Sequence, residues 1–128
     1  MGKILIVDDQ VGVRCLLAEI FKKDHKVLMA ENGMEALRLL MPFKPDLIFM
    51  DMKMPGMNGI ETLEKIRALD HRVAMIMMSA YGDIQNSERA KDLGILYFMD
   101  KPFDLFEIRE RVADILDSSG IISKALIN

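Results

Sequence analysis

The chain has 128 residues and a net charge of −3, with 51% hydrophobic and 29% charged residues. This composition is ordinary for one soluble globular domain that is long enough to bury a core. The charge gives no basic surface for nucleic acid, and no apolar run approaches the roughly 20 residues of a membrane span. The single cysteine, Cys15, excludes an internal disulfide and favours a reducing compartment. The first apolar run follows Met1 almost at once and leaves no room for a signal peptide, so we expect a cytoplasmic protein.

Apolar runs between turn-forming residues alternate along the chain with stretches whose apolar residues have helical spacing. In chain order, the apolar runs predict strands at about 3–8, 26–30, 46–51, 73–78 and 95–99. The intervening stretches predict helices at about 11–23, 32–41, 59–69, 84–93 and 104–117. Helices between buried strands are typical of an α/β protein with a parallel sheet covered on both faces.

Individual residues predict several helix boundaries. We expect Pro42 and Pro45 to end the second helix, because proline cannot continue the helical hydrogen-bond pattern. Ser118-Ser119-Gly120 is expected to break the last helix, which gives a domain at 1–117 and a tail or linker at 118–128.

The first helix is expected to carry an apolar face formed by Val13, Leu16, Leu17, Ile20 and Phe21.

The starts of three predicted helices resemble capping boxes, in which a short polar residue is followed three positions later by glutamate. The pairs are Asn32 with Glu35, Asn58 with Glu61, and Asp104 with Glu107. The fourth predicted helix has few apolar anchors, so we expect it to move or fray more easily than the other helices.

Four predicted strands end on, or next to, side chains suited to handling a phosphoryl group. Asp8 and Asp9 follow the first strand, and Asp51 ends the third. Ser79 follows the fourth strand, and Lys101 lies just after the fifth. The ligand site of a parallel α/β sheet lies beyond the carboxyl ends of its strands, so we expect these five side chains to share one crevice.

The three aspartates predict a divalent cation. Carboxylates this close repel one another and raise one another's pKa values, and a cation removes the conflict. Oxygen ligands without a Cys/His cluster favour Mg²⁺ over zinc, and Mn²⁺ is an alternative. Mg²⁺ typically binds one or two carboxylates and keeps coordination open for a phosphoryl oxygen.

One carboxylate of this set is placed to act as a nucleophile and form an aspartyl phosphate. The ammonium of Lys101 is suited to neutralising oxygens of the transferred group, and the Ser79 hydroxyl to donating a hydrogen bond. Phosphoryl transfer requires little of a protein beyond such positioning and charge neutralisation. The residues therefore predict transfer of a phosphoryl group to or from aspartate.

The motifs ILIVDD, LIFMDMKMPGMNG, MMSAYG and KPF resemble those of response-regulator receiver domains of bacterial two-component signalling. The resemblance extends over about 1–117, with consistent spacing between the motifs. It implies a flavodoxin-like, doubly wound sheet of five parallel strands in the order 2-1-3-4-5, with five helices around it. It also implies a signalling phosphoprotein that assists its own phosphorylation and dephosphorylation, not an enzyme with a separate substrate.

The same resemblance implies a role for each acidic residue. By position, Asp51 matches the phosphoacceptor. Asp9, Asp51 and the main-chain carbonyl of Lys53 match direct Mg²⁺ ligands. Asp8 matches a ligand that usually acts through water.

The family also implies a conformational switch and an active-site lysine. Ser79 matches the hydroxyl that follows the phosphoryl group, and Phe98 matches the switch aromatic. Lys101 matches the lysine that contacts the phosphoryl group, with a cis peptide bond to Pro102 that aims it inward. Phosphorylation is expected to draw Ser79 inward and to open space that Phe98 fills.

Within the family, Asp9-Gln10, Tyr81-Gly82 and the segment 101–104 are similar to the single-domain regulator of a sporulation phosphorelay. Such a regulator receives its phosphoryl group from a sensor histidine kinase and passes it to a histidine phosphotransferase. A receiver that acts on an output domain through the conformational switch is the other route. This chain is expected to bind neither nucleic acid nor membrane.

The partner is expected to contact the strand-end loops and the first helix. The residues predicted to bind it are Gln10, Val11, Gly12, Val13, Cys15, Tyr81, Pro102 and Phe103. Lys53 and Tyr81, each two residues past a site residue, are expected to restrict access of water to the phosphoaspartate.

Three other functions fit parts of the sequence. A flavodoxin-like cofactor binder needs a phosphate loop after the first strand, where Asp8 and Asp9 would repel phosphate in the absence of metal. An aspartate-nucleophile phosphatase of the haloacid-dehalogenase type needs a second acid where Lys53 stands. The chain also fits a receiver fragment of a longer DNA-binding transcriptional regulator, whose DNA-binding domain would lie outside the sequence, since nothing after Ser118 resembles a helix-turn-helix.

Overall fold

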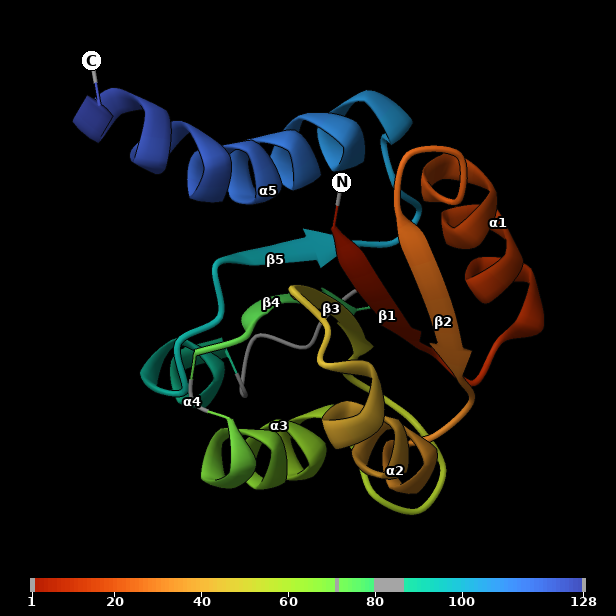
Figure 1. The fold of residues 1–128 in the computed structure, drawn as a ribbon. Helices are drawn as coiled ribbons and strands as arrows, with labels where there is room; N and C mark the ends of the chain where they lie inside the picture. Colours follow the sequence, from red (N-terminus) through yellow and green to blue (C-terminus); the bar gives the residue numbers. More distant parts are fainter. Residues whose placement is uncertain (1, 71, 80–86, 128) are drawn as a thin grey trace.

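The computed structural model describes residues 2–70, 72–79 and 87–127, and their side chains except those of 87 and 117–127 (Figure 1). Its strands are β1 (Lys3–Val7), β2 (Lys26–Ala30), β3 (Leu47–Asp51), β4 (Ala74–Ser79) and β5 (Tyr97–Asp100). They form one sheet in the order β2-β1-β3-β4-β5, and every neighbouring pair is parallel. The predicted strand order and fold class are confirmed.

Helices cover both faces of the sheet, as Figure 1 shows. They are α1 (Val11–Phe21), α2 (Gly33–Phe43), α3 (Gly59–Leu69), α4 (Ser87–Asp92) and α5 (Leu105–Ile127). α1 and α5 pack on one face, while α2, α3 and α4 pack on the other. No described helix combines the length and the apolar character needed to cross a membrane.

The strands alternate their side chains between two apolar clusters. On β1, Ile4 and Ile6 face α1 and α5, whereas Leu5 and Val7 face the helices of the opposite side. All four side chains are completely buried. The sheet is thus held between two cores, and its strand ends are fixed in position relative to one another. The methionines of β3 and β4 belong to these cores and are completely buried.

Two predicted helix ends were wrong. α2 continues through Pro42 and ends at Phe43, where Lys44 takes a left-handed conformation with φ of 52°. Proline in the last turn removes only one helical hydrogen bond, so the helix persists to its cap. α5 continues through 118–120 to Ile127. A single glycine costs a helix only about 1 kcal/mol relative to alanine, which is too little to end it.

Leu16 also departs from the prediction for α1. Leu17 and Phe21 are buried, and Val13 and Ile20 are partly buried, but Leu16 is 44% exposed. The predicted apolar face is therefore wider than the surface that the sheet and α5 cover, and Leu16 lies on its open border.

The predicted caps are confirmed. The side chain of Asn32 accepts a hydrogen bond from the Glu35 N–H, and Asn58 and Glu61 form a complete capping box. Asp104 accepts hydrogen bonds from the first N–H groups of α5. Each cap fixes the start of a helix directly after a loop at the carboxyl edge of the sheet, which is where the predicted site lies.

Candidate functional site

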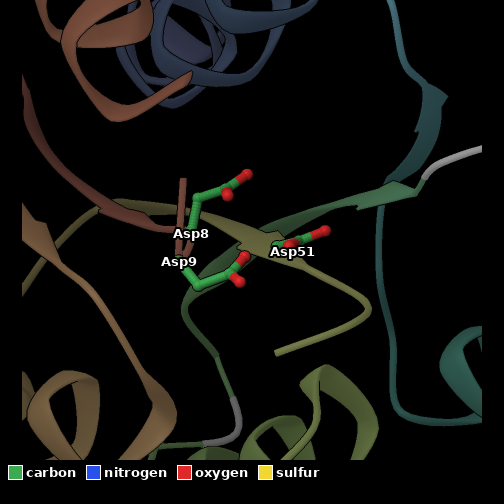
Figure 2. Close-up of side chains that lie close together, drawn as sticks. All are labelled: Asp8, Asp9 and Asp51. Atoms are coloured by element: carbon green, nitrogen blue, oxygen red, sulfur yellow. The ribbon is translucent and has the colours of Figure 1, made fainter. Parts of the chain in front are cut away.

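Strand register places the acidic residues side by side. Val7 of β1 is paired with Met50 of β3, so the next residues, Asp8 and Asp51, occupy neighbouring strand ends. Asp8 is completely buried and Asp51 is 4% exposed, whereas Asp9 lies exposed in the following loop. One carboxylate oxygen from each of the three residues lies within 4.8 Å of the others (Figure 2). The crevice predicted from the sequence therefore contains all three acids.

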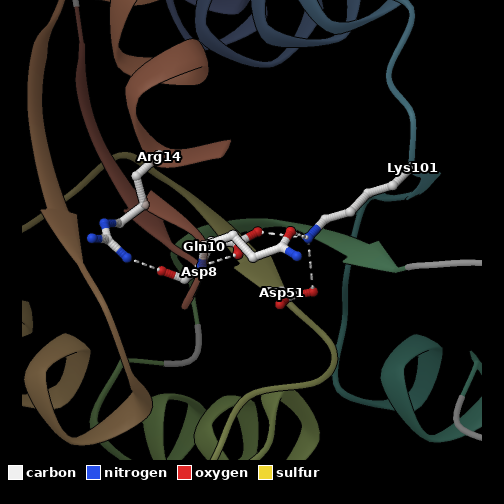
Figure 3. A network of polar contacts seen from close by, with 5 residues as sticks. All are labelled: Asp8, Gln10, Arg14, Asp51 and Lys101. Carbon is white, nitrogen blue, oxygen red and sulfur yellow. Dashed lines mark hydrogen bonds and ion pairs between the residues drawn. The ribbon is translucent and has the colours of Figure 1, made fainter. Parts of the chain in front are cut away.

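The pairing of β4 with β5 brings Lys101 to the same place. The N–H of Lys101 donates to the carbonyl oxygen of Ser79 at 2.8 Å. The ammonium of Lys101 lies 2.8 Å from Asp8 Oδ2 and 3.4 Å from Asp51 Oδ1 (Figure 3). The Lys101-Pro102 peptide bond is cis, as the family resemblance implied. One cation thus stands between the two buried carboxylates.

Two further residues hold Asp8, and the sequence analysis did not assign them this role. The N–H of Gln10 donates to Asp8 Oδ1 at 2.9 Å, and its side-chain oxygen accepts from Lys101 at 3.3 Å. Arg14 donates to the main-chain carbonyl of Asp8 at 2.7 Å, as Figure 3 shows. These bonds and the ion pair compensate the burial of a carboxylate. The available sequence signal was the spacing of Gln10 and Arg14, which are one helical turn apart.

Burial makes Asp51 an unusual carboxyl group. Its pKa rises from 3.8 to about 6, first because of desolvation and second because of the negative charge of Asp8. Lys101 opposes this rise through its charge and its hydrogen bond, and Asp9 adds a smaller upward contribution. At neutral pH Asp51 is nevertheless ionised, and the negative charges of the neighbouring carboxylates favour the binding of a cation beside it.

The close contact between β3 and α3 fixes the Asp51 backbone. The N–H of Met52 donates to the Met78 carbonyl at 2.7 Å, and the N–H of Gly59 donates to the Met52 carbonyl at 2.9 Å. A Cβ atom on Gly59 would collide with the main-chain oxygen of Asp51 and lie 2.9 Å from Met52 Cα. Only glycine allows α3 to begin this close to the acidic residue.

The three carboxylates fit a magnesium ion. Adjacent ligands of octahedral Mg²⁺ lie about 3 Å apart and opposite ligands about 4.2 Å apart. The three carboxylate oxygens lie within 4.8 Å of one another, which is close to that range. All the donors are oxygens, which is the ligand type that Mg²⁺ and Mn²⁺ prefer. Lys53 lines the same cleft as Asp9 and Asp51.

A cleft of about 790 Å³ opens beside the acids, between α1 and the start of α5. Its lining consists of Asp9, Gln10, Gly12, Val13, Leu16, Asp51, Lys53, Lys101, Pro102 and Phe103. Most of the predicted partner-binding residues therefore surround the acidic site. Val11 and Cys15 are exposed on α1 but do not line the cleft, and Tyr81 lies outside the described residues. Leu16 also lines the cleft, although it was predicted only as part of the apolar face of the first helix.

The two predicted switch residues lie on neighbouring strands. Ser79 ends β4, is 1% exposed and is paired with Asp100. Phe98 is paired with Met77 and packs, partly buried, against the core on the α2–α4 side of the sheet. Both residues therefore lie within one strand pair, with Ser79 at its carboxyl end and Phe98 two residues before the partner of Ser79 on β5.

Comparisons with known proteins agree with this arrangement. A family model for the response regulator receiver domain matches residues 4–113. The chain is 45% identical to sporulation initiation phosphotransferase F of Bacillus subtilis (strain 168), over 89% of this chain and 93% of that protein. It is 37% identical to regulatory protein AtoC of Escherichia coli (strain K12), over 84% of this chain but only 24% of that protein.

A solved structure shows the same architecture. A CheY-like response regulator receiver domain protein from Methanospirillum hungatei JF-1 is 28% identical and matches with a TM-score of 0.87. The match covers 92% of this chain and 95% of that chain. The family match, the strand order and the grouped carboxylates lead to one conclusion. The chain belongs to the family of response regulator receiver domains.

Proposed function

We propose that Asp51 is the phosphoacceptor of this receiver domain and takes its phosphoryl group from a phosphohistidine of a sensor histidine kinase. The observation that carries the proposal is the placement of Asp51 on the cleft, with the Lys101 ammonium at 3.4 Å and two further carboxylates in reach of a shared cation. Asp8 and Asp9 are less suited as acceptors, because Asp8 is completely buried beneath the ion pair and Asp9 lies in the exposed loop.

The reaction requires one bond to form and one to break. A carboxylate oxygen of Asp51 attacks phosphorus, while the phosphorus–nitrogen bond breaks and its electron pair remains on the imidazole of the donor. Asp51 must be ionised to attack, and a pKa of about 6 leaves it ionised at neutral pH. The Lys101 ammonium is near enough to neutralise charge on the transferred oxygens.

Magnesium is the cofactor that we propose for this step. Asp9, Asp51 and the main-chain carbonyl of Lys53 would hold it directly, with Asp8 acting through water; Mn²⁺ is a substitute. Bound there, the ion supplies positive charge to the phosphoryl oxygens. The ligand assignment rests on the family match and on the separation of the three carboxylates.

We further propose that the domain acts in a phosphorelay and passes its phosphoryl group on to a histidine phosphotransferase. The similarity to a sporulation initiation phosphotransferase, over 93% of that protein, supports this role. The apolar wall of the cleft, formed by Val13, Leu16 and Phe103, offers a surface for a partner helix that brings its histidine to Asp51. The free, exposed thiol of Cys15 suits the reducing cytoplasm in which we place this reaction.

A conformational output is the second candidate. The match to regulatory protein AtoC, of which this chain covers 24%, favours a receiver that controls other domains of a longer regulator. In that case Ser79 and Phe98 would transmit phosphorylation to the face formed by α4 and β5, and this chain itself would not contact DNA.

Intact mass spectrometry tests the phosphoacceptor directly. Incubation with Mg²⁺ and phosphoramidate, whose phosphorus–nitrogen bond imitates phosphohistidine, should add one phosphoryl group to the wild type. Asp51→Asn should gain none, whereas the exposed-site control Asp24→Asn should react like the wild type. Equal labelling of Asp51→Asn would refute the assignment.

The relay role has its own test. Leu16→Arg should react normally with phosphoramidate, because Leu16 borders the cleft but is not among the acids. The same variant should lose transfer to a histidine phosphotransferase of the same organism, because a charge now stands on the docking surface. Unimpaired transfer by Leu16→Arg would contradict the proposed surface.

A further inference from the structure

Arg67, in the last turn of α3, joins three segments of the chain through its guanidinium. Its Nε donates to the Leu93 carbonyl at 2.6 Å, and a terminal nitrogen donates to the Gly94 carbonyl at 3.2 Å. The other terminal nitrogen donates to the Val73 carbonyl at 2.7 Å and reaches the Asp70 carbonyl at 3.5 Å. All four acceptors are main-chain oxygens, so the contact depends on the path of the backbone and not on a partner side chain.

The acceptors Leu93 and Gly94 form the turn that ends α4. Gly94 has a φ of +83°, its N–H donates to the Lys91 carbonyl, and the N–H of Ile95 donates to the Ala90 carbonyl. This is a Schellman arrangement, in which the chain reverses sharply at the end of a helix. The guanidinium therefore places a positive charge at the negative end of the α4 dipole. The turn leads directly into β5, because Leu96 N–H already donates to the Met75 carbonyl at 2.8 Å.

α4 has few other described anchors. It is only six residues long, and Ala90 is its one fully buried described side chain. The ion pair between Arg89 and Glu64 ties it to α3 at 3.2 Å, but both side chains are about half exposed. Exposed ion pairs of this kind stabilise a contact only weakly, so this pair does little to fix the position of α4. The two hydrogen bonds from Arg67 to the Leu93 and Gly94 carbonyls are therefore the strongest side-chain attachment that the described residues give to α4 and its turn.

We infer that Arg67 is a positioning residue that fixes the carboxyl end of α4 to α3 and β4, so that the response of α4 to phosphorylation is a pivot about the Leu93–Gly94 turn. The inference rests on the proposed function, because it concerns how the change at Asp51 reaches α4. It follows from the contrast between two contacts of the described residues, one at the turn and one at Arg89 in the body of the helix. The turn is bonded to a guanidinium that also bonds the entry to β4, whereas the Arg89–Glu64 contact is exposed.

Only arginine supplies this geometry. The planar guanidinium directs its N–H groups to separate carbonyls, whereas a lysine ammonium acts as a compact charge on a flexible stem. Partial burial of the group is tolerated because its donors are paired, although desolvation lowers its pKa and the charge of Asp70 opposes that change. Arg67→Met keeps much of the apolar stem and removes the hydrogen-bond donors. Arg67→Lys keeps the positive charge but loses the planar arrangement of N–H donors.

Amide hydrogen exchange in the unphosphorylated protein tests the attachment. Arg67→Met should speed exchange of the 93–96 amides by about tenfold or more, as expected for loss of hydrogen bonds from a charged donor. Arg67→Lys should lie between that variant and the wild type, and Arg89→Met should leave these amides unchanged. Unchanged exchange in Arg67→Met would overturn the inference, as would an equal increase in β1 and β3, which would show a general loss of stability.

The pivot is tested by phosphorylation with phosphoramidate and Mg²⁺. In the wild type, NMR shift changes should be large at Arg89 and Phe98 and small at Leu93 and Gly94. In Arg67→Met, the changes should extend into the turn. Wild-type changes at Gly94 as large as those at Phe98 would overturn the pivot. Failure of the proposed function has a different signature, namely the absence of a phosphoryl adduct in the wild type, while the exchange result for Arg67→Met is measured without phosphorylation.

Discussion

Replacing Asp51 by asparagine should make the metal-free protein more stable at neutral pH. In the unfolded chain the carboxyl group loses its proton near pH 3.8, and in the folded protein near pH 6. The folded state therefore binds more protons between these values, and the free energy of unfolding falls as the pH rises through this window. Above pH 6, Asp51 is ionised in both states, and the free energy of unfolding is reduced by the full penalty for burying the charge. The shift from 3.8 to about 6 amounts to about 3 kcal/mol at about 1.36 kcal/mol per pKa unit.

Asparagine has nearly the same shape as aspartate but carries no charge. The net shift to about 6 already includes the favourable 3.4 Å contact with Lys101, so this contact is not subtracted a second time. We expect Asp51→Asn to raise the free energy of unfolding by about 3 kcal/mol at about pH 7.5, and by much less at about pH 4.

Urea unfolding at several pH values, in the presence of a chelator, measures this difference. The exposed Asp24→Asn serves as the control and should change little at any pH. An equal gain in stability for Asp51→Asn at both ends of the pH range would show that the gain does not come from the charge of Asp51. A loss of stability at about pH 7.5 would refute the prediction.

Three other predictions concern the same site. Lys101→Met should raise the pKa of Asp51 above 6, because Lys101 lowers this pKa through its charge and its hydrogen bond. NMR titration of the Asp51 carboxyl carbon measures the pKa, and an unchanged value would contradict the prediction. Gly59→Ala should lower the free energy of urea unfolding by about 3 kcal/mol and slow the phosphoryl labelling of Asp51, because the added methyl group collides with the Asp51 backbone. Gly12→Ala should change neither quantity, because Gly12 has open space around it. Mg²⁺ should raise the Tm of the wild type and raise that of Asp9→Asn less, and an equal rise in both would remove Asp9 from the ligand set.

The parts of the fold that depend on local pattern could be predicted from the sequence. Apolar runs and turn residues define strands such as Ile4–Val7, and parallel pairing then follows from the helices between them. Because parallel strands share one carboxyl edge, the order of the residues along the chain was enough to bring Asp8, Asp51 and Lys101 together.

Other features depend on tertiary contacts that no local pattern contains. Leu16 is exposed because it borders the open cleft between α1 and the start of α5. The second helix continues past Pro42 to its cap at Lys44. The roles of Arg14 and Arg67 depend on carbonyl groups that fold next to them. In the sequence, either arginine reads as an ordinary surface charge of an amphipathic helix.

In the proposed reaction, Asp51 carries the phosphoryl group, and Lys101 and Ser79 contact it. A structure of the protein with Mg²⁺ and beryllofluoride, which imitates a phosphoryl group on aspartate, would reveal these contacts. We expect beryllium bonded to a carboxylate oxygen of Asp51, with the Lys101 ammonium and the Ser79 hydroxyl each within hydrogen-bond distance of a fluoride. Beryllofluoride bound to another aspartate, or a cleft without it under saturating conditions, would contradict the account.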